Sequence, residues 1–128
     1  MQDSTISALF EEWNTALQTG SPKNVVTLYE PNAILLPTVS NKVRHNHEEI
    51  ENYFFNFLKK GPKGVINESN IRTFGNIAIN SGVYTFSFND GNTVQARFTF
   101  VYRRNEQRWL IIEHHSSAMP EGWDSASK

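Results

Sequence analysis

The last third of the chain, residues 94–120, alternates between apolar and polar side chains over two stretches joined by a charged turn. In the first stretch every second residue is apolar or aromatic, with Gln95, Arg97 and Thr99 between them. A period of two residues is typical of β-strands, because successive side chains point to opposite faces of a sheet. Residues 105–107, Asn-Glu-Gln, are expected to turn the chain, so this stretch predicts a β-hairpin.

The residues before this hairpin predict helices first and strands afterwards. The apolar spacing predicts helices over residues 3–20, 22–29 and 47–60, and strands over residues 33–38, 65–74 and 76–88. Pro37 places the first of these strands at a sheet edge, since proline has no N–H for a central ladder. This order of elements indicates an α+β fold, in which three N-terminal helices pack on a curved, mostly antiparallel sheet.

The predicted strands carry more aromatic surface than we expect a single layer of helices to cover. Phe86, Phe88, Phe98 and Phe100 fall on strand faces, and we expect part of their apolar area to stay uncovered. Exposed apolar sheet surface of this kind marks interfaces between proteins. The pattern therefore favours a homo-oligomer.

Length and composition limit the functions that the chain can have. Its 128 residues suit one domain over residues 1–128, with residues 121–128 as a frayed tail. The formal net charge of −1 gives no support for nucleic-acid binding, and the chain has no cysteine. No apolar run reaches the ~20 residues that a membrane helix needs, and the N-terminus lacks a signal pattern. A cytoplasmic location is the expectation that remains.

A polar cluster ends the second strand of the hairpin, where the apolar residues stop. Glu113, His114 and His115 are the candidate catalytic residues, because histidine and carboxylate groups transfer protons near neutral pH. A regular strand points His114 and His115 to opposite faces, so only one of them can face a pocket. Which one does so stays open, since a single β-bulge exchanges the two faces. The alternative role is a hydrogen-bonded histidine at a subunit interface.

Further candidates lie on the strands and on the third helix. Arg97 lies on a strand expected to be central, so its guanidinium must face a cavity as an anion anchor or pair with Glu113 or Glu68. Tyr29, Tyr53 and Tyr84 offer hydroxyl groups to a pocket. Without an aspartate at an evident pocket position, the tyrosines give limited support to an isomerase.

The sequence predicts neither a metal site nor a bound cofactor. His45 and His47 form a His-x-His pair, but no third ligand is placed near them, and His47 suits the start of a helix. No glycine-rich dinucleotide fingerprint occurs.

The order of elements and the final hairpin resemble a known family. The relevant residues are Tyr102-Arg103-Arg104, Trp109-Leu110-Ile111-Ile112, His115, Ser117 and Pro120. They are similar to the association (hub) domain of calcium/calmodulin-dependent protein kinase II, in the stand-alone bacterial form, within the nuclear transport factor 2-like (SnoaL-like) superfamily. The resemblance implies a cone-shaped α+β domain with a pocket between helices and sheet. It also implies a homodimer or larger ring, while kinase catalytic motifs are missing from these residues.

The resemblance also implies a pocket for a small carboxylate, which hub domains hold with several arginines. The corresponding positions here are Val83, Thr99 and Ser116, so only Arg97 is expected to supply a charge. The resulting set of ligand-binding candidates is Arg97, Thr99, Ser116, Tyr53 and Tyr84.

Two hypotheses follow from the sequence. The first is a homo-oligomerising association-domain module with a pocket for a small, acidic organic ligand. The alternative is a cofactor-independent enzyme of the isomerase, dehydratase or cyclase type that uses acid–base residues in the pocket. A peptide-binding adaptor would rest on analogy of fold alone.

Overall fold

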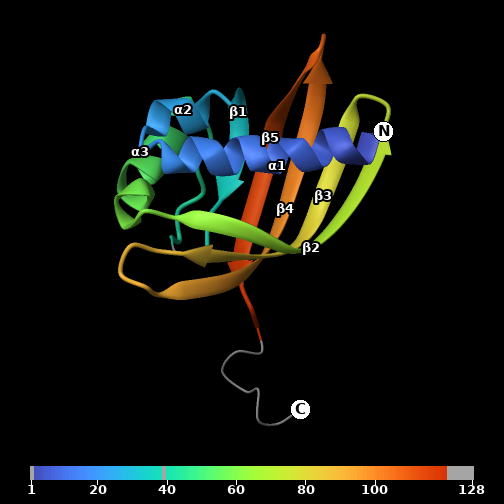
Figure 1. The fold of residues 1–128 in the computed structure, drawn as a ribbon. Helices are drawn as coiled ribbons and strands as arrows, with labels where there is room; N and C mark the ends of the chain where they lie inside the picture. The colour runs from blue at the N-terminus through green and yellow to red at the C-terminus, as the bar shows by residue number, and fades with distance from the viewer. Residues whose placement is uncertain (1, 39, 121–128) are drawn as a thin grey trace.

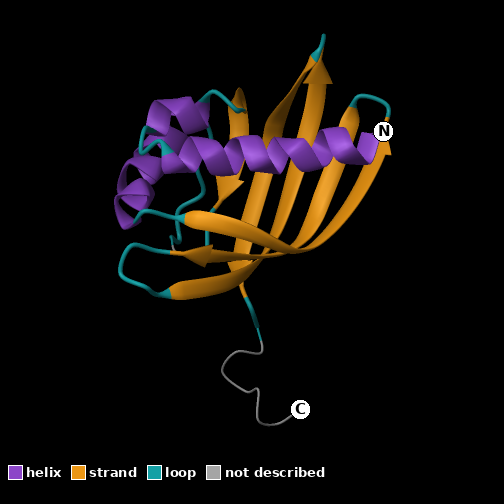
Figure 2. Cartoon of the chain, viewed as in Figure 1, coloured by secondary structure: helices purple, strands orange, loops and turns teal. Residues whose placement is uncertain are grey.

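The computed structural model describes residues 2–38 and 40–120, and it consists of one sheet with helices over one face (Figures 1 and 2). The helices are α1 (Gln2–Gln18), α2 (Pro22–Val26), α3 (His47–Phe57) and the short 3-10 helix η1 (Leu58–Lys60). The strands are β1 (Tyr29–Leu36), β2 (Lys63–Phe74), β3 (Ile77–Ser87), β4 (Thr93–Asn105) and β5 (Arg108–Ala118). The predicted α+β fold is confirmed, and the proposed tail at residues 121–128 lies outside the described residues.

The strand order in the sheet is β1-β5-β4-β3-β2. Strands β2 to β5 pair antiparallel with their neighbours, and β1 joins the edge of β5 in parallel. The edge position predicted from Pro37 is therefore confirmed, since Pro37 directly follows β1 at that edge. The sheet curves, and α1 crosses its concave face in front of β2 to β5 (Figure 1).

The second helix is shorter than the sequence pattern indicates. It ends at Val26, and Tyr29 begins β1 instead of completing the helix. The backbone N–H of Ile111 donates to the Leu28 carbonyl at 2.9 Å, so pairing with β5 begins there. Pro31 follows and has no N–H with which a helix could continue.

The core fills the space between α1 and the concave face of the sheet. Ile6, Phe10, Trp13 and Leu17 follow helical spacing on α1 and are all at most 1% exposed. The Trp13 ring lies 5.3 Å from Phe100, 6.0 Å from Phe86 and 6.5 Å from Phe54 between centroids. Aromatic rings at these separations attract each other beyond their buried area.

This packing corrects one expectation about the strand phenylalanines. Phe86, Phe98 and Phe100 are at most 6% exposed, and Phe88 packs partly buried against the same core. They lie on the concave face and pack in the core beneath the helices, so only Phe88 keeps part of its area exposed. The expected interface surface must therefore come from other residues.

A buried asparagine attaches α1 to β2. The Asn14 side chain donates to the Gly64 carbonyl at 2.9 Å and accepts from the Gly64 N–H at 2.8 Å. Gly64 suits this site because an added Cβ would lie only 3.1 Å from the Phe86 ring and 3.3 Å from Phe10. Both polar groups of a buried backbone unit are thus satisfied by one side chain.

We predict that Asn14→Ala lowers the free energy of unfolding by about 2 kcal/mol or more, because it leaves the buried N–H and C=O of Gly64 without partners. Urea unfolding measures the change. Asn52→Ala, on the exposed side of α3, is the matched control and should change stability by about 0.5 kcal/mol or less. Equal effects of the two substitutions would contradict this role for Asn14.

Candidate functional site

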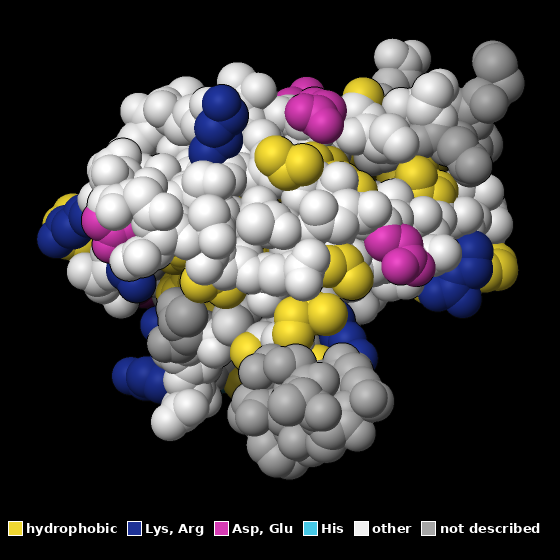
Figure 3. Space-filling view, turned by 60° about the horizontal axis from the view of Figure 1, so that its bottom comes forward, with side chains coloured by type: hydrophobic (Ala, Val, Ile, Leu, Met, Phe, Trp, Pro, Cys, Tyr) yellow, Lys and Arg dark blue, Asp and Glu magenta, His cyan; other side chains and the backbone are white. Residues whose placement is uncertain are grey.

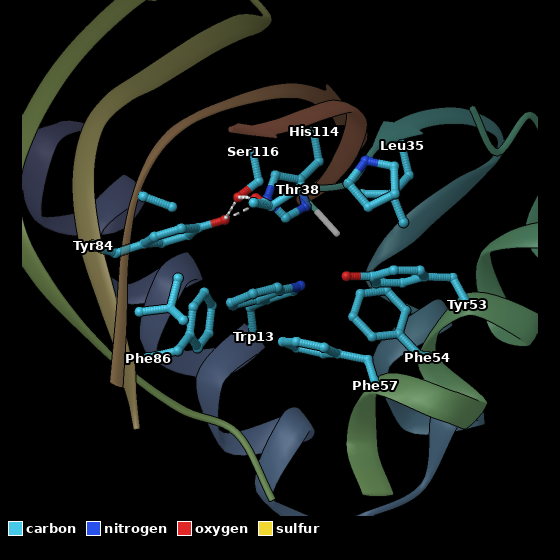
Figure 4. Close-up of a pocket in the computed structure, with 13 residues that line it drawn as sticks. Trp13, Leu35, Thr38, Tyr53, Phe54, Phe57, Tyr84, Phe86, His114 and Ser116 are labelled. Carbon is cyan, nitrogen blue, oxygen red and sulfur yellow. Dashed lines mark hydrogen bonds between the residues drawn. The ribbon is translucent and has the colours of Figure 1, made fainter. Parts of the chain in front are cut away.

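A cleft between the concave face of the sheet and the helices is the candidate site, and we call it the aromatic cleft (Figure 4). It is lined by Trp13, Leu35, Pro37, Thr38, Tyr53, Phe54, Phe57, Tyr84, Phe86, Val94, Ala96, His114 and Ser116. Its cavity volume is about 40 Å³, and the cleft is open to solvent at its mouth.

A β-bulge in β5 decides which polar residues face the cleft. Val101 of β4 pairs with Glu113, but the next residue, Tyr102, pairs with Ile111, so Ile112 is the extra residue. Before the bulge Ile111 points into the core, and after it His114 does so. The sequence pattern placed Ile111 and Glu113 on one face, and the bulge separates them. His114 therefore faces the cleft, while Glu113 and His115 are exposed on the outer face.

His114 is held by a tyrosine on each side of its ring. Its Nδ1 lies 2.9 Å from the Tyr29 hydroxyl, and its Nε2 lies 3.2 Å from the Tyr84 hydroxyl. The ring also stacks on Phe100, with 4.0 Å between centroids and 19° between planes. The indole N–H of Trp13 donates to the Tyr29 hydroxyl at 3.1 Å. Four elements, α1, β1, β3 and β4, thus fix the position of this histidine on β5.

Two small hydroxyl groups extend this arrangement toward the mouth of the cleft. The Tyr84 hydroxyl donates to Ser116 Oγ at 2.7 Å, and the Thr38 hydroxyl donates to the same oxygen at 2.6 Å (Figure 4). Ser116 is two residues after His114 on β5, so both side chains point to the concave face. Thr38 comes from the segment after β1, the neighbour of β5 in the sheet.

Burial keeps the ionisable groups of the cleft neutral. The pKa of His114 is lowered to about 3, first because burial disfavours its charged form and second because His115 lies nearby. Burial raises the pKa of Tyr29 and of Tyr84 well above the usual range for tyrosine. Burial also raises the pKa of Tyr53 to about 12, with a smaller opposing effect of Arg44. Near neutral pH, His114 is an uncharged imidazole and each tyrosine carries its proton.

Three of the five ligand-binding candidates line the cleft, namely Tyr53, Tyr84 and Ser116. Arg97 and Thr99 do not line it, since both point to the outer face of β4. Arg97 is exposed, so the expectation that it faces a cavity or a buried partner is wrong. The reason is the alternation of β4, in which Ala96, Phe98 and Phe100 take the inner positions.

His45, which precedes α3, and His47, which begins it, have structural partners. His45 Nδ1 lies 2.9 Å from Glu49 Oε1, and His47 Nε2 donates to the Tyr29 carbonyl at 2.6 Å. Within residues 2–38 and 40–120 the structure contains no cluster of three or more histidine, cysteine or acidic residues suited to a metal ion.

Sequence reasoning missed the contributions of Trp13 and Thr38 to this site, and it named the Tyr29 hydroxyl as a pocket candidate without placing Tyr29 on a strand. Trp13 belongs to an apolar helical stripe, and this stripe by itself indicates core packing. Tyr29 was assigned to a helix, and Thr38 adjoins a loop. A signal for a strand at this point did exist, because Glu30 directly precedes Pro31 and the residue before a proline favours extended backbone.

The face of the molecule shown in Figure 3 gives no indication of a polyanion site. On the face shown in Figure 3, hydrophobic side chains lie in small groups among polar atoms, and both basic and acidic side chains occur.

No helix in the described part of the chain is long and apolar enough to cross a membrane.

Comparison with known proteins identifies related sequences and folds. The sequence model of the calcium/calmodulin-dependent protein kinase II association domain matches residues 2–120. A Xanthomonas campestris protein described as such an association domain is 54% identical, with a TM-score of 0.88, covering 91% of this chain and 87% of the other. No curated protein gives a significant match.

More distant structures share the fold. A nuclear transport factor 2-like protein of unknown function from Pseudomonas putida is 16% identical with a TM-score of 0.80, covering 91% of this chain and 85% of the other. A Parabacteroides distasonis structure described as a ketosteroid isomerase is 22% identical with a TM-score of 0.75, covering 90% and 86%. The fold is therefore nuclear transport factor 2-like.

We predict that buried His114 makes the protein less stable as the pH falls. In the unfolded chain the imidazole takes up a proton below about pH 6.5, whereas the folded protein resists this until about pH 3. Between these values the unfolded state binds one more proton, so the free energy of unfolding falls by about 1.4 kcal/mol per pH unit.

Urea unfolding at several values between about pH 6 and pH 4.5 tests this prediction. Glutamine cannot titrate in this range, so His114→Gln should lack the decrease of the unfolding free energy with falling pH that His114 causes. Its stability should be lower than that of the wild type at every pH. His115→Gln is the matched control and should keep the slope, because the buried ring remains. The same pH dependence in the wild type and in His114→Gln would show that His114 is protonated in the folded protein.

Proposed function

This chain belongs to the calcium/calmodulin-dependent protein kinase II association domain family, and on that premise we propose that it is a self-associating module with a cleft for a small organic ligand. The observation that supports this proposal most strongly is that the two faces of the sheet have different surroundings. The concave face forms the aromatic cleft, and the described helices lie on this side (Figure 1). The outer face remains for a second copy of the chain.

The outer face has the composition of a self-complementary interface. Ile79 and Val83 of β3 and Val101 of β4 are only partly buried there, at the centre of the sheet. Arg97 and Glu113 are exposed on the same face. In a twofold pair each patch meets its own copy, so opposite charges around an apolar centre can complement one another. This arrangement supports a dimer or a larger ring.

The expected carboxylate ligand has little support in the cleft itself. That expectation rested on Arg97, which lies on the other face of the sheet. Among the described residues that line the cleft, none carries a charged side chain near neutral pH. The cleft therefore suits an organic molecule without a net negative charge.

The second candidate function is a cofactor-independent isomerase, dehydratase or cyclase. It is supported by one buried histidine with hydrogen-bonded hydroxyl groups in a cleft. Both nitrogens of His114 are already engaged, and Glu113 and His115 point away from the cleft. An acid–base step would therefore have to use the hydroxyl of Ser116 or of Tyr53. If the protein is an enzyme of this kind, Ser116→Ala and Tyr53→Phe should abolish turnover. If it is a self-associating module, both variants should keep the wild-type assembly.

We predict that the protein is a dimer or larger at micromolar concentration and that Val101→Asp dissociates it. A carboxylate at the centre of the outer face would have to be desolvated in the assembly without a partner. Size-exclusion chromatography with light scattering gives the mass, and circular dichroism checks the fold. Phe55→Asp, which replaces an exposed apolar residue on α3, should keep the wild-type mass. A monomeric wild type, or an unchanged mass for Val101→Asp, would refute self-association through this face.

A further inference from the structure

The hydrogen bonds of the aromatic cleft form a chain whose direction is set at one end. The chain begins at the indole N–H of Trp13, which can only donate. It donates to the Tyr29 hydroxyl at 3.1 Å, and that hydroxyl lies 2.9 Å from His114 Nδ1. The oxygen of Tyr29 therefore accepts from Trp13, and its hydrogen is available for the histidine.

This direction assigns the tautomer of His114. If Nδ1 accepts from Tyr29, the proton of the neutral ring is on Nε2 and is donated to the Tyr84 hydroxyl at 3.2 Å. The opposite tautomer would leave the hydroxyl hydrogen of Tyr29 without an acceptor among the described residues. Tyr29 is 1% exposed, so an unsatisfied donor there would lose its hydration without compensation.

The chain ends with one spare donor at the cleft. Tyr84 accepts from His114 and so donates to Ser116 Oγ, which also accepts from Thr38. The hydrogen of the Ser116 hydroxyl is then left over. Reversing the bond between Ser116 and Thr38 only transfers the spare hydrogen to Thr38, because each hydroxyl group has one hydrogen. In both arrangements this end of the cleft offers a donor.

A second donor comes from α3, on the other side of the cleft. The hydroxyl of Tyr53 is directed into the cleft (Figure 4), and it has no hydrogen-bond partner among the described residues. The only buried side-chain polar atom without a partner in that part of the chain is the Tyr102 hydroxyl, so the Tyr53 hydroxyl is reachable from the cleft. The raised pKa of Tyr53 keeps its proton in place near neutral pH.

We propose that the aromatic cleft binds a neutral small molecule through an acceptor oxygen, such as a carbonyl, which receives hydrogen bonds from Tyr53 and from the Ser116–Thr38 pair. This inference rests on the ligand cleft of the proposed function and names the class of ligand. The hydroxyl groups receive the oxygen-bearing group, and the aromatic walls and open mouth take an apolar body. A carboxylate is disfavoured because it would lose its hydration in a cleft whose lining includes no cation. Arg44 lies over the Tyr53 ring, 5.3 Å from its centroid, but it does not line the cleft.

Acetophenone and benzoate are the probes for this inference. The two molecules have nearly the same shape, and they differ in whether the group that carries the carbonyl is neutral or charged. The indole N–H resonance of Trp13, which lines the cleft, reports binding in a ¹⁵N–¹H NMR titration. We expect acetophenone to bind about tenfold or more tightly than benzoate. Equal or tighter binding of benzoate overturns the inference.

Three substitutions locate the donors. Tyr53→Phe and Ser116→Ala should each weaken acetophenone binding about three- to tenfold, because each removes a donor. Thr99→Val removes a hydroxyl from the outer face of the same sheet and should leave binding unchanged. Unchanged binding in both cleft variants overturns the proposed contacts.

The tautomer of His114 is measured without any ligand. Long-range ¹⁵N–¹H correlations of its ring should show a proton on Nε2 and none on Nδ1. A proton on Nδ1 overturns the direction of the chain. If neither probe binds while light scattering still shows an assembly, the ligand class is wrong and self-association stands. If acetophenone binds to a monomer, the ligand class stands and self-association fails.

Discussion

The hydrogen bond from the Trp13 indole to the Tyr29 hydroxyl is the contact on which the interior of the site depends. Trp13 packs against aromatic rings of the sheet and of α3, so its position is set by the core. Since its N–H can only donate, it also sets the direction of every hydrogen bond that follows through His114 to Ser116. Trp13 thus takes part both in the packing of the core and in the hydrogen bonds of the cleft.

The curved sheet separates two kinds of surface. Its inner face is aromatic, buried and without charge where it lines the cleft. Its outer face combines partly buried aliphatic residues with exposed charges such as Arg97 and Glu113. The proposed ligand site and the proposed interface thus lie on opposite faces of the same strands. At the bulge at Ile112, the alternation of side chains along β5 shifts by one residue, so different residues point to each face before and after it.

Much of the fold could be predicted from the sequence, because alternation in the strands and apolar spacing in the helices are local signals. The α+β class, the final hairpin and the edge position of the strand before Pro37 all followed from such patterns. The site was harder to predict. Tyr53, Tyr84 and Ser116 were named, but Arg97 was placed inside the protein although it is exposed. The choice between His114 and His115 depended on the bulge, which comes from pairing with β4 and leaves no local pattern.

A native mass spectrum of the purified protein, first under gentle conditions and then with collisional activation, tests the central claim most directly. It reports the number of subunits and any molecule carried in the cleft in one measurement. The account predicts an assembly of two or more chains that releases only neutral adducts, with the same result after Arg97→Gln. A monomer, or an anionic adduct that disappears in Arg97→Gln, would contradict the account.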